Sequence, residues 1–365
     1  MELQEVTFLN ELAIIPNNTF DSCIHLNVVN LPKNIEVIGA EAFSGCSLLE
    51  TINIPSTLKT IDQKAFISCI SLKEINLPNS LENINEEAFS RCVVLKKVEI
   101  PEGIKTISKS VFQDCFALEE VILPESLTDI EDKAFSSCIN LNKINLPSNL
   151  STIGKSSFSE CQSLDNIKLP ESLLTIKDYA FESCSSLSRI EIPSKVTSIG
   201  VGIFLFCTGL LEVEINGEYD TLPRYMFGTC KNLKTIKFGE KIKSFTYETF
   251  MDCGKIETII VDENNPYIDS RDNCNAVIFT STNSLIFASN KTTIPDSVVK
   301  ISSYAFYNLS DIKDIYIGLN VTNISENAFV NCKGLTIHYA GTEIPLTWSA
   351  NWNINDIPVE FNSTK

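Results

Sequence analysis

The cysteines are the residues of this sequence whose number and spacing most suggest chemistry. Thirteen are present, and eleven of them follow one another with a constant period of 23, from Cys23 to Cys253. A row of thiols invites a redox or metal-binding interpretation. However, there is no close Cys-x-x-Cys pair, and copies translated along one axis do not converge on one point as metal ligands must. We therefore expect buried, apolar thiols with a structural role. Cys274 lies outside this register and is the best candidate for an exposed, reactive thiol.

The two histidines, His25 and His338, offer little support for catalysis. Neither is paired by the sequence with a serine or cysteine nucleophile. The chain contains no Gly-x-Ser-x-Gly or His-Glu-x-x-His motif and no glycine-rich phosphate loop. The sequence therefore predicts a non-enzymatic protein with no catalytic residues, no cofactor and no metal. One alternative stays open, a Ca²⁺ site in the segment from Asp262 to Asp272. The acidic and amide side chains of this segment are oxygen ligands of the kind that Ca²⁺ prefers. Such residues also simply form turns.

The elements that position these residues form a repeat. Phenylalanine recurs with the same period from Phe20 to Phe250, each time three positions before a cysteine, and proline recurs with it from Pro32 to Pro193. A unit of this length is too short to bury its own apolar face, but stacked units cover one another. The period thus predicts a solenoid rather than the two or three separate domains that 365 residues would otherwise suggest.

One unit, residues 72–92, indicates the local structure. Ile75 and Leu77 alternate with a polar residue, which is typical of a short strand, and the proline that follows ends the strand. Leu81 and Ile84 point inward from a second extended or turn segment. Residues 86–89 suit one tight helical turn that drives the phenylalanine into the core. The strands of neighbouring units then form one continuous parallel β-sheet.

The repeat Leu-x-x-Ile-x-Leu-Pro-x-x-Leu-x-x-Ile-x-x-x-Ala-Phe-x-x-Cys resembles the Treponema-type leucine-rich repeat of the BspA-like proteins. The resemblance covers nearly the whole chain, but it weakens where Ala-Phe becomes Ser157-Phe158 or Thr249-Phe250. It implies an α/β solenoid, a right-handed leucine-rich-repeat superhelix of about 13 coils with short helical turns opposite the sheet. It also implies a cell-surface or secreted adhesin that binds host or matrix proteins.

We expect a single solenoid over residues 1–365. It comprises regular repeats over 1–253, an elaborated repeat with a projecting hairpin-like insert over 254–293, regular repeats over 294–334, and a C-terminal cap over 335–365 in which the period is lost. The BspA-like family carries a similar Asp-x-Asn-Asn-Pro insert. No dedicated cap precedes the first repeat, so the array is expected to begin abruptly or to be cut.

Charge and targeting signals narrow the partners and the location. The net charge of −17 argues against a nucleic-acid ligand. The sequence has no signal peptide, lipid anchor or apolar segment long enough for direct membrane insertion. An intracellular leucine-rich-repeat scaffold is therefore the alternative to the surface adhesin, and many free thiols also favour it.

The outward-facing strand positions are the candidate binding surface, because solenoids use their concave sheet for broad protein contacts. They form a mixed-charge face with an acidic zone at Glu191, Glu212 and Glu214. Together with two residues of the insert, the candidate protein-binding residues are Glu74, Glu99, Glu120, Lys143, Arg189, Glu191, Glu212, Glu214, Tyr267 and Arg271. The ligand and the oligomeric state do not follow from the sequence.

Overall fold

The computed structural model describes residues 2–9 and 11–364. Two compact units make up the chain. Unit 1 comprises residues 1–187 and 198–204, and unit 2 comprises residues 188–197 and 205–365. Between them they contain about 15 turns of parallel strands, slightly more than the 13 coils predicted. The single solenoid over 1–365 stays a prediction.

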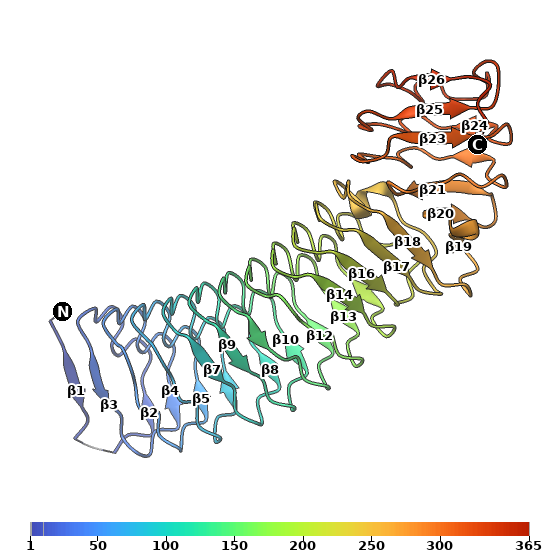
Figure 1. Ribbon diagram of the computed structural model, residues 1–365. Helices are drawn as coiled ribbons and strands as arrows, with labels where there is room; N and C mark the ends of the chain where they lie inside the picture. The colour runs from blue at the N-terminus through green and yellow to red at the C-terminus, as the bar shows by residue number, and fades with distance from the viewer. Residues whose placement is uncertain (1, 10, 365) are drawn as a thin grey trace. The chain divides into compact units, whose positions relative to one another are not determined.

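The first ladder of strands is built from the Ile-x-Leu segment of each repeat, and all its pairings are parallel, as predicted (Figure 1). In unit 1 its strands are β1 (Glu5–Thr7), β3 (Val28–Asn30), β7 (Lys97–Glu99), β9 (Glu120–Ile122) and β11 (Lys143–Ile144). In unit 2 they are β14 (Arg189–Ile192), β16 (Glu212–Ile215), β17 (Thr235–Phe238), β18 (Thr258–Val261), β23 (Asp314–Ile317), β25 (Thr336–Tyr339) and β26 (Val359–Glu360). Regular pairing is interrupted in unit 1 between β3 and β7, so the ladder is not one continuous sheet.

A second ladder of strands forms from the segment around Ile84, for which the sequence allowed either an extended or a turn conformation. Each coil contributes two residues, of which the second is an isoleucine that points into the core, as at Ile61 and Ile107. In unit 1 these strands are β2 (Ile14–Ile15), β4 (Val37–Ile38), β5 (Thr60–Ile61), β6 (Asn83–Ile84), β8 (Thr106–Ile107), β10 (Asp129–Ile130), β12 (Thr152–Ile153), β13 (Thr175–Ile176) and β15 (Ser198–Ile199). Because this ladder also bonds coil to coil, the stack does not depend on unbroken pairing in the first.

The predicted helical turns are wrong, because only alternate N–H groups of the turn before each cysteine bond within the turn, and the others bond to the next coil. The backbone N–H groups of Lys64, Phe66 and Ser68 donate to carbonyl oxygens of the next coil, at 2.8–3.0 Å. In this turn Lys64 and Ser68 have φ values of 56° and 59°, a left-handed conformation that no α-helix contains. Among the described residues the helical elements are two 3₁₀ turns, η1 (Tyr247–Phe250) and η2 (Arg271–Asn273).

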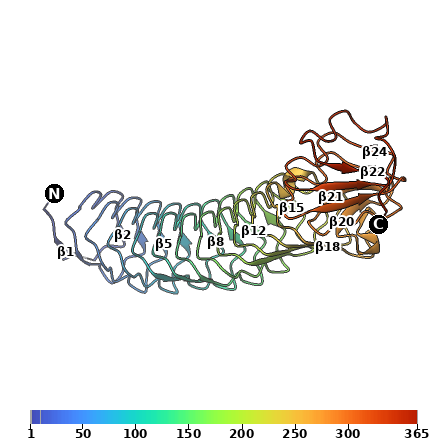
Figure 2. The same ribbon diagram turned by 45° about the horizontal axis from the view of Figure 1, so that its top comes forward.

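The phenylalanine column forms the centre of the core in unit 1. Phe43 and Phe66 are fully buried, and their rings stack with centroids 5.3 Å apart and planes 5° apart. The same stacking continues at 5.2–5.6 Å from one coil to the next as far as Phe204. Figure 2 shows the successive coils of unit 1 lying side by side. Isoleucines and leucines of both ladders close around this stack.

The insert of unit 2 forms the predicted hairpin, but the hairpin does not project. Its strands β19 (Ile268–Asp269), β20 (Ala276–Phe279) and β21 (Ser284–Ala288) pair antiparallel, and β21 continues in parallel into β22 (Lys300–Ile301) and then β24 (Asn323–Ile324). The side chains of Val277 and Leu285 are fully buried. Because β20 and β21 are apolar, they are buried as part of the same sheet as β22 and β24. The insert therefore widens the second ladder.

The last coil keeps the period that the sequence analysis expected to be lost. Trp352 lies one full period after Phe329, and its ring meets that phenylalanine edge-on with centroids 6.0 Å apart. Trp348 packs against Trp352, and both indoles are more than 90% buried. Tryptophan replaces phenylalanine at the end of the column, where the larger ring covers the apolar face left by the last repeat.

Candidate functional site

The candidate site in unit 1 lies on the outward face of β7, β9 and β11, here called the sheet face. Parallel register places Lys97, Glu120 and Lys143 beside one another on adjacent strands. The Nζ atom of Lys97 lies 3.2 Å from Oε2 of Glu120, and both side chains are at least one-third exposed. Such an exposed ion pair contributes only about 0–1 kcal/mol, so either member exchanges its partner at small cost.

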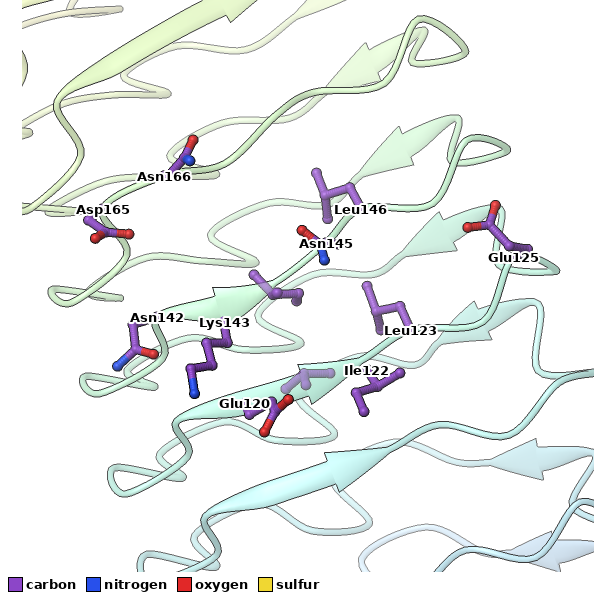
Figure 3. A pocket seen from close by; sticks show the side chains of 12 residues that line it. Glu120, Ile122, Leu123, Glu125, Asn142, Lys143, Asn145, Leu146, Asp165 and Asn166 are labelled. Atoms are coloured by element: carbon purple, nitrogen blue, oxygen red, sulfur yellow. The ribbon is translucent and has the colours of Figure 1, made fainter.

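A shallow groove of about 580 Å³ crosses the sheet face at β9 and β11 (Figure 3). Polar side chains dominate its lining, with three carboxylates, three amides and one lysine, and Ile122 provides an exposed apolar contact. The charged and amide residues are Glu120, Glu125, Asn142, Lys143, Asn145, Asp165 and Asn166. The groove therefore has an excess of negative charge and many hydrogen-bonding groups.

A second groove, of about 350 Å³, lies next to it on the same face and contains Glu74, Lys97 and Glu99. The structure thus brings four predicted residues into two neighbouring grooves: Glu74, Glu99, Glu120 and Lys143. Asn142 and Asp165 also line the larger groove but were not among the predicted residues, because the prediction rested only on the residues that directly flank each central isoleucine. Their signal was available, since each lies two residues before such an isoleucine.

Two residues of the expected acidic zone of unit 2, Glu212 and Glu214, belong to a balanced ion network. Glu212 and Glu214 each lie within 4.0 Å of both Arg189 and Lys237, and the shortest distance is 2.6 Å, from Lys237 Nζ to Glu212 Oε1. The hydrogen bond from Lys237 lowers the pKa of Glu212, and the same bond raises the pKa of Lys237. Glu191 accepts a hydrogen bond of 3.3 Å from the amide of Asn216. Two cations from neighbouring strands therefore compensate Glu212 and Glu214.

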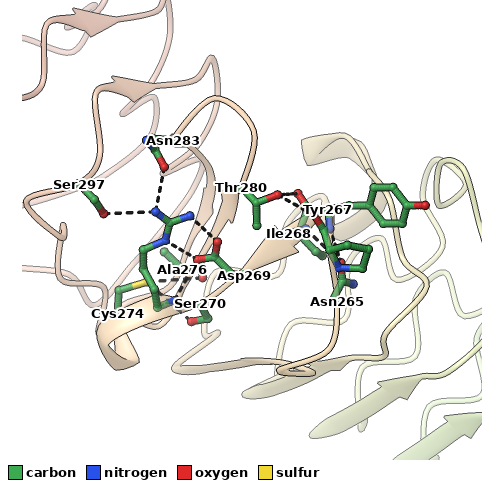
Figure 4. A network of polar contacts seen from close by, with 12 residues as sticks. Asn265, Tyr267, Ile268, Asp269, Ser270, Cys274, Ala276, Thr280, Asn283 and Ser297 are labelled. Atoms are coloured by element: carbon green, nitrogen blue, oxygen red, sulfur yellow. Dashed lines mark hydrogen bonds and ion pairs between the residues drawn. The ribbon is translucent and has the colours of Figure 1, made fainter.

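Asn265 holds the insert of unit 2 in place (Figure 4). Its amide nitrogen donates to the carbonyl oxygens of Gly239 and Ile242 at 2.8 and 3.0 Å, and its Oδ1 accepts from the N–H groups of Tyr267 and Ile268. The side chain is 6% exposed, and these four bonds use its full hydrogen-bonding capacity. This second asparagine of the Asp-x-Asn-Asn-Pro segment is therefore structural.

The two candidate residues of the insert have different surroundings. Arg271 bonds Asp269 through Nε at 2.7 Å and Asn283 through Nη1 at 2.8 Å, so its guanidinium holds η2 against the β20–β21 hairpin. The ring of Tyr267 is 42% exposed, with Lys243 Nζ 5.6 Å from its centroid. Tyr267 is thus the member that faces solvent.

The regular cysteines form the buried column that the repeat predicts. Most of these thiols, as at Cys69, donate to the carbonyl of the phenylalanine one coil before their own, at 3.2 Å for Cys69. Burial raises the pKa of the Cys46 thiol to about 12. All thirteen cysteines are buried. The expectation of an exposed, reactive Cys274 is wrong: it is fully buried beneath the β20–β21 hairpin, and burial raises its pKa. Buried, protonated thiols are poor nucleophiles.

The two histidines have different surroundings. His25 is exposed in a turn. His338 lies on β25 between two carboxylates, with Asp314 2.9 Å from Nε2 and Glu360 3.0 Å from Nδ1, and its ring stacks on Tyr316. These contacts link β23, β25 and β26, so His338 has a positioning role in the last coils.

Across the described residues, no helix has the length and apolar character that a membrane crossing demands.

The stacked coils, parallel strands and buried phenylalanine and cysteine columns define a leucine-rich-repeat solenoid. The sequence profile of the BspA type leucine rich repeat region matches in six copies, over residues 1–119, 105–227, 153–282 and 278–345. The chain belongs to this family.

Several solved structures are similar to this chain, and the first of those named here supports the same fold. A leucine-rich repeat protein from Bacteroides ovatus is 25% identical with a TM-score of 0.69, over 98% of this chain and 91% of that one. A leucine rich cell surface protein from Faecalibacterium prausnitzii is 25% identical with a TM-score of 0.48, over 100% and 89%. A leucine rich repeat protein from Treponema pallidum is 28% identical with a TM-score of 0.33, over 55% and 72%. A comparison with curated proteins finds no match.

Proposed function

We propose that this protein is a non-enzymatic adhesion module that binds a host or matrix protein through its repeat surface. The observation that carries the proposal is the pair of neighbouring grooves on the sheet face of unit 1. Four residues chosen from the repeat register line them: Glu74, Glu99, Glu120 and Lys143. An open polar groove fits a protein segment better than a small metabolite, which needs an enclosed and mostly apolar pocket.

The charge of the grooves indicates the partner's chemistry. Together they contain five carboxylates and two lysines, and the whole chain carries a net charge of −17. A partner segment rich in lysine, arginine and amide side chains complements this surface and is steered toward it. In unit 2 we propose a separate mixed-charge contact surface at Arg189, Glu191, Glu212 and Glu214, and a contact at the insert through Tyr267 and Arg271.

We also propose a location at the cell surface or outside the cell, which membership of the BspA-type family supports. The thiols do not favour the intracellular alternative, because they are buried. Burial protects such thiols from oxidation in either compartment. Protease treatment of intact cells tests the location: the proposal requires that the chain be cleaved, and a chain that stays intact until the cells are lysed contradicts it.

Binding is tested by filling the groove. Asn145 is exposed in the larger groove, and Asn145→Trp places an indole where a partner segment would lie. Leu174→Trp is the control, because Leu174 is 48% exposed beside the second ladder. With immobilised basement-membrane extract as the probe, we expect the full chain and the Leu174→Trp variant to bind and Asn145→Trp to lose at least tenfold in affinity. No binding by the full chain, or equal binding by all three, contradicts the proposal.

A further inference from the structure

A row of exposed apolar side chains runs along unit 1, at the turn that follows each cysteine. Six successive coils each place one there, and we call this set the apolar stripe: Ile24, Leu48, Ile70, Val93, Phe116 and Ile139. Five of them directly follow the cysteine, and Leu48 lies one position further along its turn. Four of the six are 42–47% exposed, and Val93 and Ile139 are partly buried. A largely exposed row of apolar side chains marks an interaction surface.

The fold does not require these apolar residues. In the next two coils of unit 1 the position after the cysteine holds Gln162 and Ser185, and in unit 2 it holds Thr208 and Lys231. Those coils close in the same way, since Leu164 and Leu187 enter the core three residues after their cysteines and are fully buried. The apolar character is thus confined to six coils and serves something other than packing of the core.

The spacing of the stripe matches one kind of partner. Successive coils of unit 1 are 5.2–5.6 Å apart at the adjacent phenylalanine column. The apolar row of an amphipathic α-helix recurs on average every 3.5 residues, or about 5.3 Å. A β-strand shows a side chain on one face only about every 6.7 Å and falls out of step within a few coils. Five intervals of the stripe, about 27 Å, correspond to about 18 residues of helix.

The charges beside the stripe determine the charge pattern that such a helix must carry. Four residues after the cysteine lies a column of exposed charges that reads acid, base, base, acid along four coils: Glu50, Lys73, Lys96 and Glu119. The pair between Lys73 and Glu50, 2.6 Å apart, is about 60% exposed on both sides and is therefore weak. A helix with a base, acid, acid, base edge complements this column.

We propose that the apolar stripe of unit 1 docks an amphipathic α-helix of about five turns from a partner protein, with the base, acid, acid, base edge over the charge column. A second copy of this chain fits less well. Its charge column reads the same in both directions, so antiparallel stripes would oppose like charges, which is destabilising. This inference concerns a surface other than the grooves and does not rest on the proposed function.

The test uses two synthetic 18-residue peptides with leucine at the heptad a and d positions and edge charges in the order Lys-Glu-Glu-Lys or Glu-Lys-Lys-Glu. Binding to the full chain is measured by fluorescence anisotropy. The stripe variant combines Ile70→Ser and Phe116→Gln, residue types that occur at this position in other coils. The control is Leu174→Ser, which removes exposed apolar surface elsewhere on unit 1.

We expect the Lys-Glu-Glu-Lys peptide to bind at least tenfold more tightly than the Glu-Lys-Lys-Glu peptide. The stripe variant should lose at least tenfold in affinity for it, and the Leu174→Ser variant should bind as the parent does. Equal affinity of the two peptides, or binding that survives in the stripe variant, overturns the inference. A chain that dimerises in light scattering and becomes monomeric only in the stripe variant also overturns it, because the stripe then serves self-association.

Discussion

Exchanging one hydroxyl between two neighbouring coils tests the reasoning about the repeat. Ser157 occupies the slot that is alanine in the preceding coil, at Ala134, and in the following coil, at Ala180, and all three are fully buried. The backbone N–H and carbonyl of Ser157 bond to Gly154 and Phe135, but within the described part of the chain its Oγ has no hydrogen-bond partner. Ser157 therefore buries a polar group that the repeat does not need.

The magnitude follows from the cost of that burial. A buried hydroxyl without a partner costs about 1–3 kcal/mol. Ser157→Ala removes the hydroxyl and should raise the free energy of unfolding by about that amount. Ala134→Ser introduces the same group into an equivalent slot and should lower it by a similar amount. The double variant should lie near the parent, because it only moves the hydroxyl by one coil.

The assay is urea unfolding followed by circular dichroism, in a reducing buffer that keeps the thiols free. Repeat arrays do not always unfold in two states, so the comparison uses midpoints of transitions with equal slopes. A lower midpoint for Ser157→Ala, or no loss for Ala134→Ser, would refute the claim that this column admits only apolar side chains without cost.

Three further predictions concern the insert, the thiols and the charge network. Asn265→Ala should destabilise unit 2 by about 2–4 kcal/mol, because it removes four hydrogen bonds and leaves buried backbone groups unpaired. The control Asn264→Ala, at an exposed position, should change stability far less. Equal effects of the two variants in urea unfolding contradict the structural role of Asn265. A thiol reagent should modify the native protein slowly, and Cys274→Ala should not slow this labelling further, because all the thiols are buried. In denaturant all thirteen thiols should react. Fast labelling of the native protein that disappears in the Cys274→Ala variant would contradict the burial of Cys274. Because Lys237 lowers the folded-state pKa of Glu212, the stabilisation by this pair is present above the carboxyl's unfolded pKa and is lost as pH falls through the folded value. Glu212→Gln should therefore flatten the acid limb of the stability–pH curve, and an unchanged acid limb excludes the contribution.

The period of 23 was enough to predict most of the fold. Phe66 and Cys69 occur at fixed positions in each coil, so their burial and stacking follow from the requirement that each coil cover the last. The turn between the ladders was not predictable in this way. Lys64 and Ser68 adopt positive φ because their N–H groups bond to the next coil, and residue types alone do not distinguish that from one helical turn. The strands of the second ladder were likewise not predicted uniquely, because the sequence allowed either an extended or a turn conformation for that segment.

The candidate site was predictable in position but not in detail. Outward strand positions such as Glu99 and Lys143 follow from the alternation around a central buried residue, and the structure places both in grooves. The compensation of Glu212 by Arg189 and Lys237 required side-chain conformations across three strands. Cys274 was misjudged because leaving the register was equated with exposure, whereas the hairpin beside it supplies its own buried face.

The central claim is that the sheet face of unit 1 binds a protein partner with basic side chains, and charge reversal tests it most directly. Glu99→Lys combined with Glu120→Lys reverses two groove carboxylates, and Glu82→Lys makes the same kind of change at an exposed position beside the second ladder. Affinity for immobilised basement-membrane extract is measured at low and at physiological salt. The account predicts that the double variant loses at least tenfold, that Glu82→Lys binds nearly as the parent does, and that the parent weakens as salt rises. Equal affinity of the double variant and the parent would contradict it.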